Sequence, residues 1–163
     1  MKNIDLLNIP IQLPENTQLV LAQSHFIKTV EDVYECLASS VPGINFGIAF
    51  CEASGPCLVR HEGNDANLES LATDYAYKIG AGHGLVILVQ NAFPINFLPR
   101  LKDVPEIVNI YCATANSVEV VLAETPLGKA ILGVIDGFKP KGIESEKDIQ
   151  ERKKLLREIG YKL

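Results

Sequence analysis

The chain has 163 residues, 47% hydrophobic and 21% charged, which is enough to bury one core without disulfide bonds. The net charge of −5 argues against nucleic-acid binding, because a protein that binds the phosphate backbone needs a basic face. No apolar run approaches the roughly 20 residues that cross a bilayer, so no membrane partner is expected. We expect a single domain over 1–163.

The first half of the chain predicts strands that alternate with helices. Apolar residues recur at helical spacing after Thr29 and alternate from Phe46 to Phe50, whereas 84–91 is apolar on both faces, as in a central strand. The turn signal Ser54-Gly55-Pro56 predicts a hairpin or β-corner. Strands are expected over 17–26, 44–54, 57–63 and 84–91, helices over 29–41 and 64–80, and a short helix or turn over 94–104.

After Pro105 the pattern predicts a three-strand antiparallel meander followed by an amphipathic helix that ends at Gly160. The strands are expected over 106–115, 117–125 and 129–137, and the helix over 144–160. The whole chain therefore predicts an α/β (α+β) fold, with a mixed sheet of six or seven strands and helices packed on it.

Cysteine spacing bears on metals and on the cellular compartment. The four cysteines form no CxxC pair and lie beside apolar residues, so we expect reduced core thiols in a cytoplasmic protein and no metal site. They are Cys36, Cys51, Cys57 and Cys112.

The usual phosphate-binding motifs are missing from the sequence. Gly128-Lys129 resembles part of a P-loop, but Ala123 stands where the first glycine belongs and Ala130 follows the lysine. The glycines at 80, 82 and 84 give GxGxG, which is not the dinucleotide fingerprint. No cofactor is predicted with certainty.

Polar residues gather where the predicted strands end. Because ligands in open α/β sheets bind at strand ends, we expect these residues to form one site. They are Glu52, Ser54, Gly55, Arg60, Asn64, Asp65, Gly82, His83, Thr114, Asn116 and Asp136.

Each of these residues also has a structural explanation. Asn64 and Asp65 are typical of helix N-termini, with Asn64 expected as the cap, and Asn116 is typical of a left-handed turn. Arg60 is a natural ion-pair partner for Glu52 across the hairpin. Ser54-Gly55-Pro56 and Asp136-Gly137 also read as turns.

His83 is the candidate catalytic residue. Its glycine neighbours allow close approach of a ligand, and an ordinary imidazole pKa of about 6.5 suits a base or nucleophile near neutrality. The alternative is a plain helix-to-strand turn. The preceding helix end disfavours anions, so Arg60 and the N-terminus of the 64–80 helix are expected to supply positive potential.

The segments "FCEASGP", "EGND", "IGAGH", "CATAN", "AET", "LGVIDG" and "ERKKLLREIGYK" together resemble the small prokaryotic family called adenosine-specific kinase. The resemblance covers nearly the whole chain. It implies a compact α/β domain, a trimer, and binding of adenosine and AMP in preference to ADP or ATP. It also implies a phosphate-carrying histidine, which we place at His83 with His61 in reserve, and pocket residues at the other motif positions.

Two functions are compatible with this resemblance. In the first, His83 accepts a phosphoryl group from an unidentified donor and passes it to adenosine, while Arg60 and backbone amides hold the phosphate. Glu52 or Asp136 then orients the imidazole or takes the ribose proton. The alternative is a non-catalytic adenosine or AMP sensor that reports through its oligomer. A third reading is a metabolic protein for another small ligand.

The mean hydropathy of the chain bears on its assembly. A value of +0.14 predicts a buried subunit interface, and with it a pocket shared between subunits.

Overall fold

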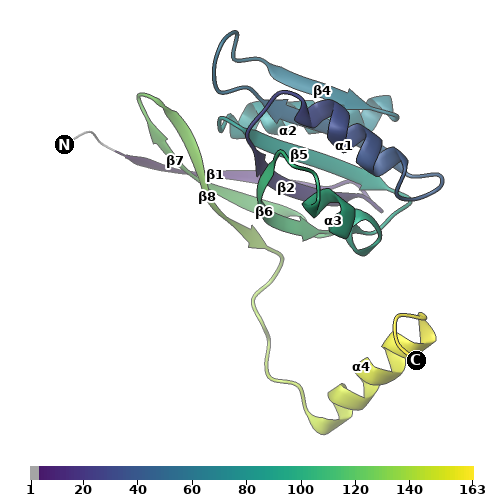
Figure 1. Cartoon of the computed structure of the whole chain (residues 1–163). Helices are drawn as coiled ribbons and strands as arrows, with labels where there is room; N and C mark the ends of the chain where they lie inside the picture. The colour runs from purple at the N-terminus through teal and green to yellow at the C-terminus, as the bar shows by residue number, and fades with distance from the viewer. Residues whose placement is uncertain (1–3) are drawn as a thin grey trace.

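The computed structural model describes residues 4–163 as eight strands and four helices, with the strands in two antiparallel sheets (Figure 1). The predicted α+β class is confirmed, although there are eight strands rather than six or seven. The strands are β1 (Asp5–Ile11), β2 (Gln18–Ser24), β3 (Asn45–Cys51), β4 (Val59–Gly63), β5 (Gly84–Gln90), β6 (Ile107–Thr114), β7 (Val118–Thr125) and β8 (Gly128–Asp136). The helices are α1 (Thr29–Ala38), α2 (Ala66–Ile79), α3 (Pro94–Lys102) and α4 (Glu146–Glu158).

The larger sheet has the strand order β4-β3-β5-β2-β6, which puts β5 in the centre as its two-faced apolar pattern predicts. Residues 84–89 of β5 are fully buried. One face of this sheet packs against α1 and α3, and the other against α2 and the smaller sheet (Figure 1). The sheet is therefore the middle layer between two hydrophobic cores.

The smaller sheet has the order β1-β7-β8, and its first strand was not predicted. β1 pairs antiparallel with β7 from Asp5 opposite Glu124 to Ile11 opposite Val118. The β7–β8 hairpin of the predicted meander is present, but β6 pairs with β2 in the larger sheet instead of joining that hairpin. The link between β6 and β7 thus carries the chain from one sheet to the other.

A glycine lets α2 lie directly on β3. A Cβ atom at Gly47 would stand 2.2 Å from the backbone of Leu68, so no other residue fits there without moving the helix. The N-cap of α2 is Asp65 and not Asn64 as predicted, because the Asp65 Oδ1 accepts hydrogen bonds of 3.0 Å from the N–H groups of Asn67 and Leu68. Gly80 ends the helix in the left-handed conformation, as predicted.

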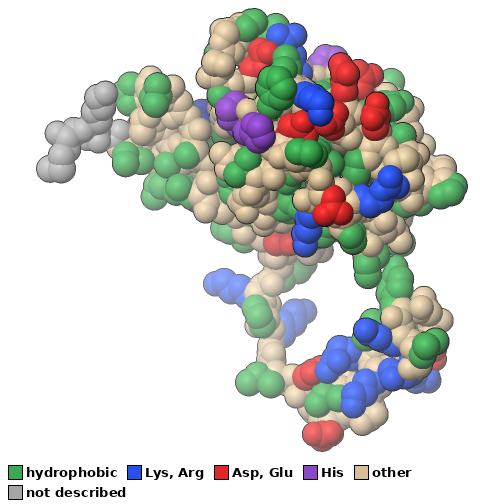
Figure 2. All heavy atoms as spheres, in the orientation of Figure 1, with side chains coloured by type: hydrophobic (Ala, Val, Ile, Leu, Met, Phe, Trp, Pro, Cys, Tyr) green, Lys and Arg blue, Asp and Glu red, His purple; other side chains and the backbone are tan. Residues whose placement is uncertain are grey.

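The C-terminal part leaves the body of the molecule after β8, and its end lies beside α3, where Ile159 and Tyr161 line a hollow with Phe93 and Ile95. Residues 137–145 form neither helix nor strand and lead to α4, in which no residue is buried in the described structure (Figure 1). Lys and Arg side chains gather on this helix (Figure 2). Among residues 4–163, no helix combines the length and hydropathy needed to cross a membrane. Cys57 is exposed, so the expectation that all four thiols lie in the core is wrong for this one.

Candidate functional site

The predicted site residues lie at two opposite ends of the larger sheet. His83 immediately precedes β5, and Glu52 immediately follows β3, so both lie at the same end of the sheet. The loop that carries Ser54 and Gly55 is at this end too, and its Ala53 lies beside Gly82. Thr114 ends β6 opposite Leu19, at the start of β2. Since β2 runs four residues further before it meets Gly84, the two ends are about 13 Å apart along that strand.

His83 is held by its backbone between two strands. Its N–H donates to the Cys51 carbonyl over 2.8 Å, and its carbonyl accepts from the Ser24 N–H over 2.9 Å. The residue itself has a φ of 62°, a left-handed conformation that side chains disfavour. The flanking glycines are required for space, since a Cβ at Gly82 would lie 3.1 Å from the Ala53 Cβ and one at Gly84 would lie 2.9 Å from the Ala81 oxygen.

The imidazole of His83 stacks on Phe50. The two ring centroids are 5.8 Å apart and the planes differ by 13°. Phe50 lies directly opposite Arg60 in the β3–β4 pair, so both side chains point to the same face, with Cβ atoms about 5 Å apart. His83, Phe50 and Arg60 therefore form a row at the end of the sheet.

The expected ion pair between Glu52 and Arg60 is present. Arg60 Nη2 lies 2.9 Å from Glu52 Oε1, and the Leu58 N–H donates to Glu52 Oε2 over 2.8 Å. The hydrogen bond from the Leu58 N–H, followed by that from the Arg60 side chain, lowers the pKa of the Glu52 carboxyl. The Arg60 Nε is buried and has no hydrogen-bond partner among residues 4–163, which leaves one charged donor free.

A cleft of about 550 Å³ opens beside Gly80 and Gly82, between the β3–β4 loop and the β7–β8 hairpin, and His83 is not among the residues that line it. It is lined by the backbone of Gly80 and Gly82, by Glu52, and by Lys129 from the hairpin. Lys129 Nζ lies 4.0 Å from Glu124 Oε1, and the Lys129 backbone bridges to Ala81. Sequence reasoning considered Lys129 only as a failed P-loop residue. No local signal marked either Lys129 or Phe50.

At the other end of the sheet, Asp136 ties two strands together. Its Oδ1 accepts hydrogen bonds from Thr114 Oγ1 over 2.8 Å and from Asn116 Nδ2 over 3.0 Å. Asn116 is outside the left-handed region, so that explanation for it is wrong, whereas Gly137 has a φ of 66° as expected in a turn. The three polar side chains satisfy one another where the chain leaves β8.

Asn64 and Asp65 also lie at that far end and have structural partners. The Asn64 side chain accepts from the Phe46 N–H and donates to the Ile44 carbonyl, both over 2.8 Å, so it extends the edge of β3. The N-terminus of α2 is therefore remote from His83. The helix that begins near His83 is α1, which starts five residues after Ser24. His61 lies on the opposite face of β4 from Arg60, within 2.6 Å of Glu69 Oε1.

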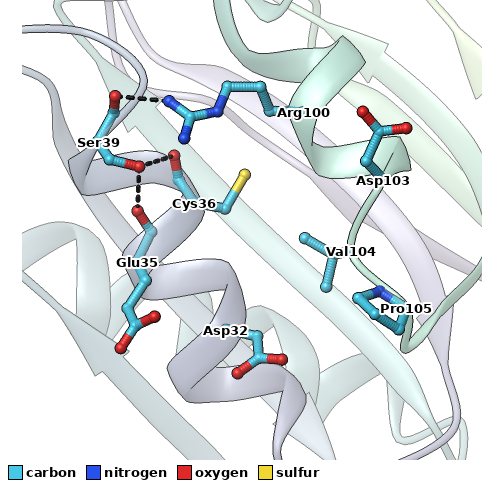
Figure 3. Close-up of a pocket in the computed structure, with 8 residues that line it drawn as sticks. All are labelled: Asp32, Glu35, Cys36, Ser39, Arg100, Asp103, Val104 and Pro105. Carbon is cyan, nitrogen blue, oxygen red and sulfur yellow. Dashed lines mark hydrogen bonds between the residues drawn. The ribbon is translucent and has the colours of Figure 1, made fainter.

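A second hollow, of about 400 Å³, lies between α1 and α3 (Figure 3). The charged side chains in its lining are mainly acidic, namely Asp32, Glu35 and Asp103. The arginine in it, Arg100, donates to the Ser39 carbonyl over 2.6 Å at the end of α1. The hollow contains none of the predicted site residues. Its one cation is occupied with capping a helix, so the His83 end is the better candidate for a ligand site.

Comparison with known proteins identifies the family. No curated protein matches the chain. The crystal structure of the PH1918 protein from Pyrococcus horikoshii OT3 is similar, with a TM-score of 0.95, 44% sequence identity, and 99% of each chain covered. The family model described as adenosine specific kinase matches residues 9–162. The chain therefore belongs to the adenosine specific kinase family, as its sequence motifs indicated.

Proposed function

We propose that this protein binds adenosine or AMP and moves a phosphoryl group through His83. The observation that carries the proposal is the fixed row of His83, Phe50 and Arg60, in which the imidazole is held by a stacked ring and a buried Arg60 Nε has no partner among the described residues. A phosphoryl group on the imidazole requires a nearby cationic donor, and we assign this role to Arg60, which lies on the other side of Phe50 in the same row.

The chemistry has two displacement steps. A ring nitrogen of neutral His83 attacks the phosphorus of a phosphoester or phosphoanhydride donor, so that an N–P bond forms and the donor oxygen leaves with the bonding pair. The 5′-hydroxyl of adenosine then attacks the same phosphorus. The O–P bond of AMP forms, the N–P bond breaks and returns its pair to the imidazole, and the hydroxyl proton passes to water or a base.

The charged residues around His83 have two proposed roles: cations stabilise the phosphoryl group, and Glu52 orients the Arg60 side chain. Glu52 fixes Arg60 through the ion pair, and its lowered pKa makes it a poor proton acceptor, so we assign it a positioning role. Lys129 adds positive charge at this end of the sheet, whereas Glu31 and Asp32 in the first turn of α1 offset the positive end of that helix. The cleft of about 550 Å³ that Glu52 and Gly82 line is large enough for a nucleoside, and it adjoins His83 through Gly82.

The remaining features of the proposal concern assembly and location. The family resemblance supports a trimer, and the grouping of site residues at two ends of one chain supports a ligand site completed between subunits. Thr114, Asn116 and Asp136 would then reach the ligand from a neighbouring subunit. The four cysteines are unpaired, which supports a reducing cytoplasmic location.

The transfer is best tested in reverse, because that direction needs no knowledge of the donor. AMP carrying labelled phosphorus is incubated with the protein, and acid-labile, alkali-stable label on the protein is measured together with release of adenosine. We expect labelling of the wild type and of His61→Asn, and no labelling of His83→Asn, which lacks the imidazole. Asparagine tolerates the left-handed conformation, so His83→Asn is expected to keep the fold. If AMP binds without labelling any chain, and equally tightly to His83→Asn, the protein is a sensor and the transfer proposal fails.

A further inference from the structure

We propose that a hollow between α3 and the end of the chain binds an uncharged nucleoside whose base presents an amino group beside a ring nitrogen, as adenine does. The hollow, which we call the α3 hollow, has a volume of about 810 Å³. It lies at the start of β2 and the end of β6, so it is at the opposite end of the larger sheet from His83 and is distinct from the site of phosphoryl transfer. Its lining includes Gln18, Phe93, Ile95, Thr114, Ile159 and Tyr161.

Apolar side chains from two parts of the chain form the walls of the α3 hollow. Phe93 and Ile95 at the start of α3 are each 59% exposed, and Ile159 and Tyr161 near the C-terminus are 51% and 47% exposed. Tyr161 is held just beyond α4, because its N–H donates to the Leu156 carbonyl over 2.9 Å. Among residues 4–163, neither Phe93 nor Tyr161 stacks on another aromatic ring. Each ring therefore has a face available to a planar ligand.

A buried amide without a partner reaches the same hollow. Gln18 begins β2 and is only 6% exposed, and alternation along the strand puts it on the same face as Val20, which packs in the core with α1 and α3. Thr114 in the same lining is already paired, since its Oγ1 donates to Asp136 Oδ1 over 2.8 Å. The Gln18 amide, by contrast, has no hydrogen-bond partner among residues 4–163. Buried amides are normally paired, so this one points to a group that enters the hollow.

The lining selects the chemical class of that group. None of the residues that line the α3 hollow is charged, so the group inside it is uncharged. The Gln18 amide offers an accepting oxygen beside a donating nitrogen. Adenine has the matching edge, because its 6-amino group donates to the oxygen while the adjacent ring nitrogen accepts from the amide nitrogen. The volume of about 810 Å³ admits a nucleoside with its base between the two apolar walls.

Photoaffinity labelling locates the site. The wild-type chain is irradiated with 2-azidoadenosine, and the labelled peptides are identified by mass spectrometry. We expect label within residues 93–95, 113–115 or 159–161, and the same label in His83→Asn, because the α3 hollow does not include the His83 turn. Absence of label from these three segments would overturn the inference, whatever happens at His83. A failure of phosphate transfer to His83, with these segments labelled, would overturn only the transfer.

A comparison of two nucleosides tests the amide, with purine riboside chosen because it lacks the 6-amino group of adenosine. In the wild type, adenosine should halve labelling of the α3 hollow at a concentration about tenfold lower than purine riboside does, since only adenosine pairs with the Gln18 oxygen. In Gln18→Leu, which keeps the size of the side chain, the two nucleosides should compete equally. Gln12→Leu is the control at an exposed position and should keep the tenfold preference.

A structural role of Gln18 would change competition by both nucleosides alike. No preference for adenosine in the wild type, or a preference that survives in Gln18→Leu, would overturn the inference.

The ring of Tyr161 is tested by the same competition. Tyr161→Phe keeps the ring and should leave the half-labelling concentration of adenosine within twofold, whereas Tyr161→Ala should raise it about fivefold or more. Tyr161 belongs to neither hydrophobic core, so both variants are expected to keep the fold. Tyr77→Ala makes the same change at an exposed position on α2 and is the control. Equal competition in Tyr161→Ala and Tyr77→Ala would overturn the placement of the base between these walls.

Discussion

The imidazole of His83 and the ring of Phe50 lie nearly parallel, 13° apart in plane and 5.8 Å apart between centroids. This contact orients the imidazole while hydrogen bonds to Cys51 and Ser24 fix the backbone. Glycine adopts a φ of 62° more readily than histidine, so the position carries a side chain that the fold itself disfavours. An outlier of this kind points to a role for the ring.

The strain at this position predicts an order of stability among variants. His83→Gly and His83→Ala both remove the ring, but only alanine keeps a Cβ at positive φ. We expect the free energy of unfolding of His83→Gly to exceed that of His83→Ala by about 1 kcal/mol in urea titrations. Equal values for the two variants would mean that the turn relaxes without cost.

The pKa of Glu52 predicts a difference in acid stability. Because the Leu58 N–H and Arg60 lower this pKa in the folded state, the ionised carboxyl stabilises the fold above its ordinary pKa of 4.5. That contribution is lost as the pH falls through the lower folded value. The melting temperature of Glu52→Gln should therefore fall less than that of the wild type when the pH is lowered from neutral to below 4.5.

The control for this pH series is Glu62→Gln, which changes an exposed carboxyl on the neighbouring strand β4. Its melting temperature should follow the wild-type pH profile. A Glu52→Gln profile that runs parallel to the wild type throughout would show that the Leu58 and Arg60 contacts do not favour the charged form.

Asn64 provides a test of structural against ligand-binding roles. Asn64→Ala removes hydrogen bonds to the Phe46 N–H and the Ile44 carbonyl, and should lower the free energy of unfolding by about 1–2 kcal/mol. Adenosine affinity, measured by calorimetry, should stay within twofold of the wild type if the site lies at the His83 end. The exposed Asn67→Ala is the control, and a selective loss of adenosine binding in Asn64→Ala would assign Asn64 to the ligand.

Local patterns predicted those parts of the fold that depend on local chemistry. The two-faced apolar run of β5, the left-handed Gly80 and the Glu52–Arg60 pair are each determined by a few neighbouring residues. β1 was missed because its Asn8 and Pro10 interrupt the strand signal and most of its residues are exposed. The pairing of β6 with β2 is a choice of distant partner, which periodicity does not encode.

The expected convergence of the site failed within one chain for a directional reason. Strand ends meet at one edge in parallel sheets, and the prediction assumed this arrangement. In the antiparallel sheet found here, the end of β6 at Thr114 lies beside the beginning of β2, whereas His83 lies beside the end of β2 at Ser24. The sequence identifies the residues at strand ends, but strand direction decides which ends are neighbours.

Gly47 predicts how closely α2 must approach β3. A methyl group at this position would stand 2.2 Å from the Leu68 backbone, and a helix backbone cannot yield as a flexible side chain does. Gly47→Ala should therefore cost about 3 kcal/mol of unfolding free energy in denaturant titrations, through displacement of α2 from the sheet. Gly133→Ala is the matched control, since this glycine also lies in a strand but has nothing within 4 Å of the added atom. If the two variants unfold at the same denaturant concentration, α2 does not pack on β3 at the distance found here. Because α2 leads into the turn that holds His83 against Cys51 of β3, the position of that turn would then also be wrong.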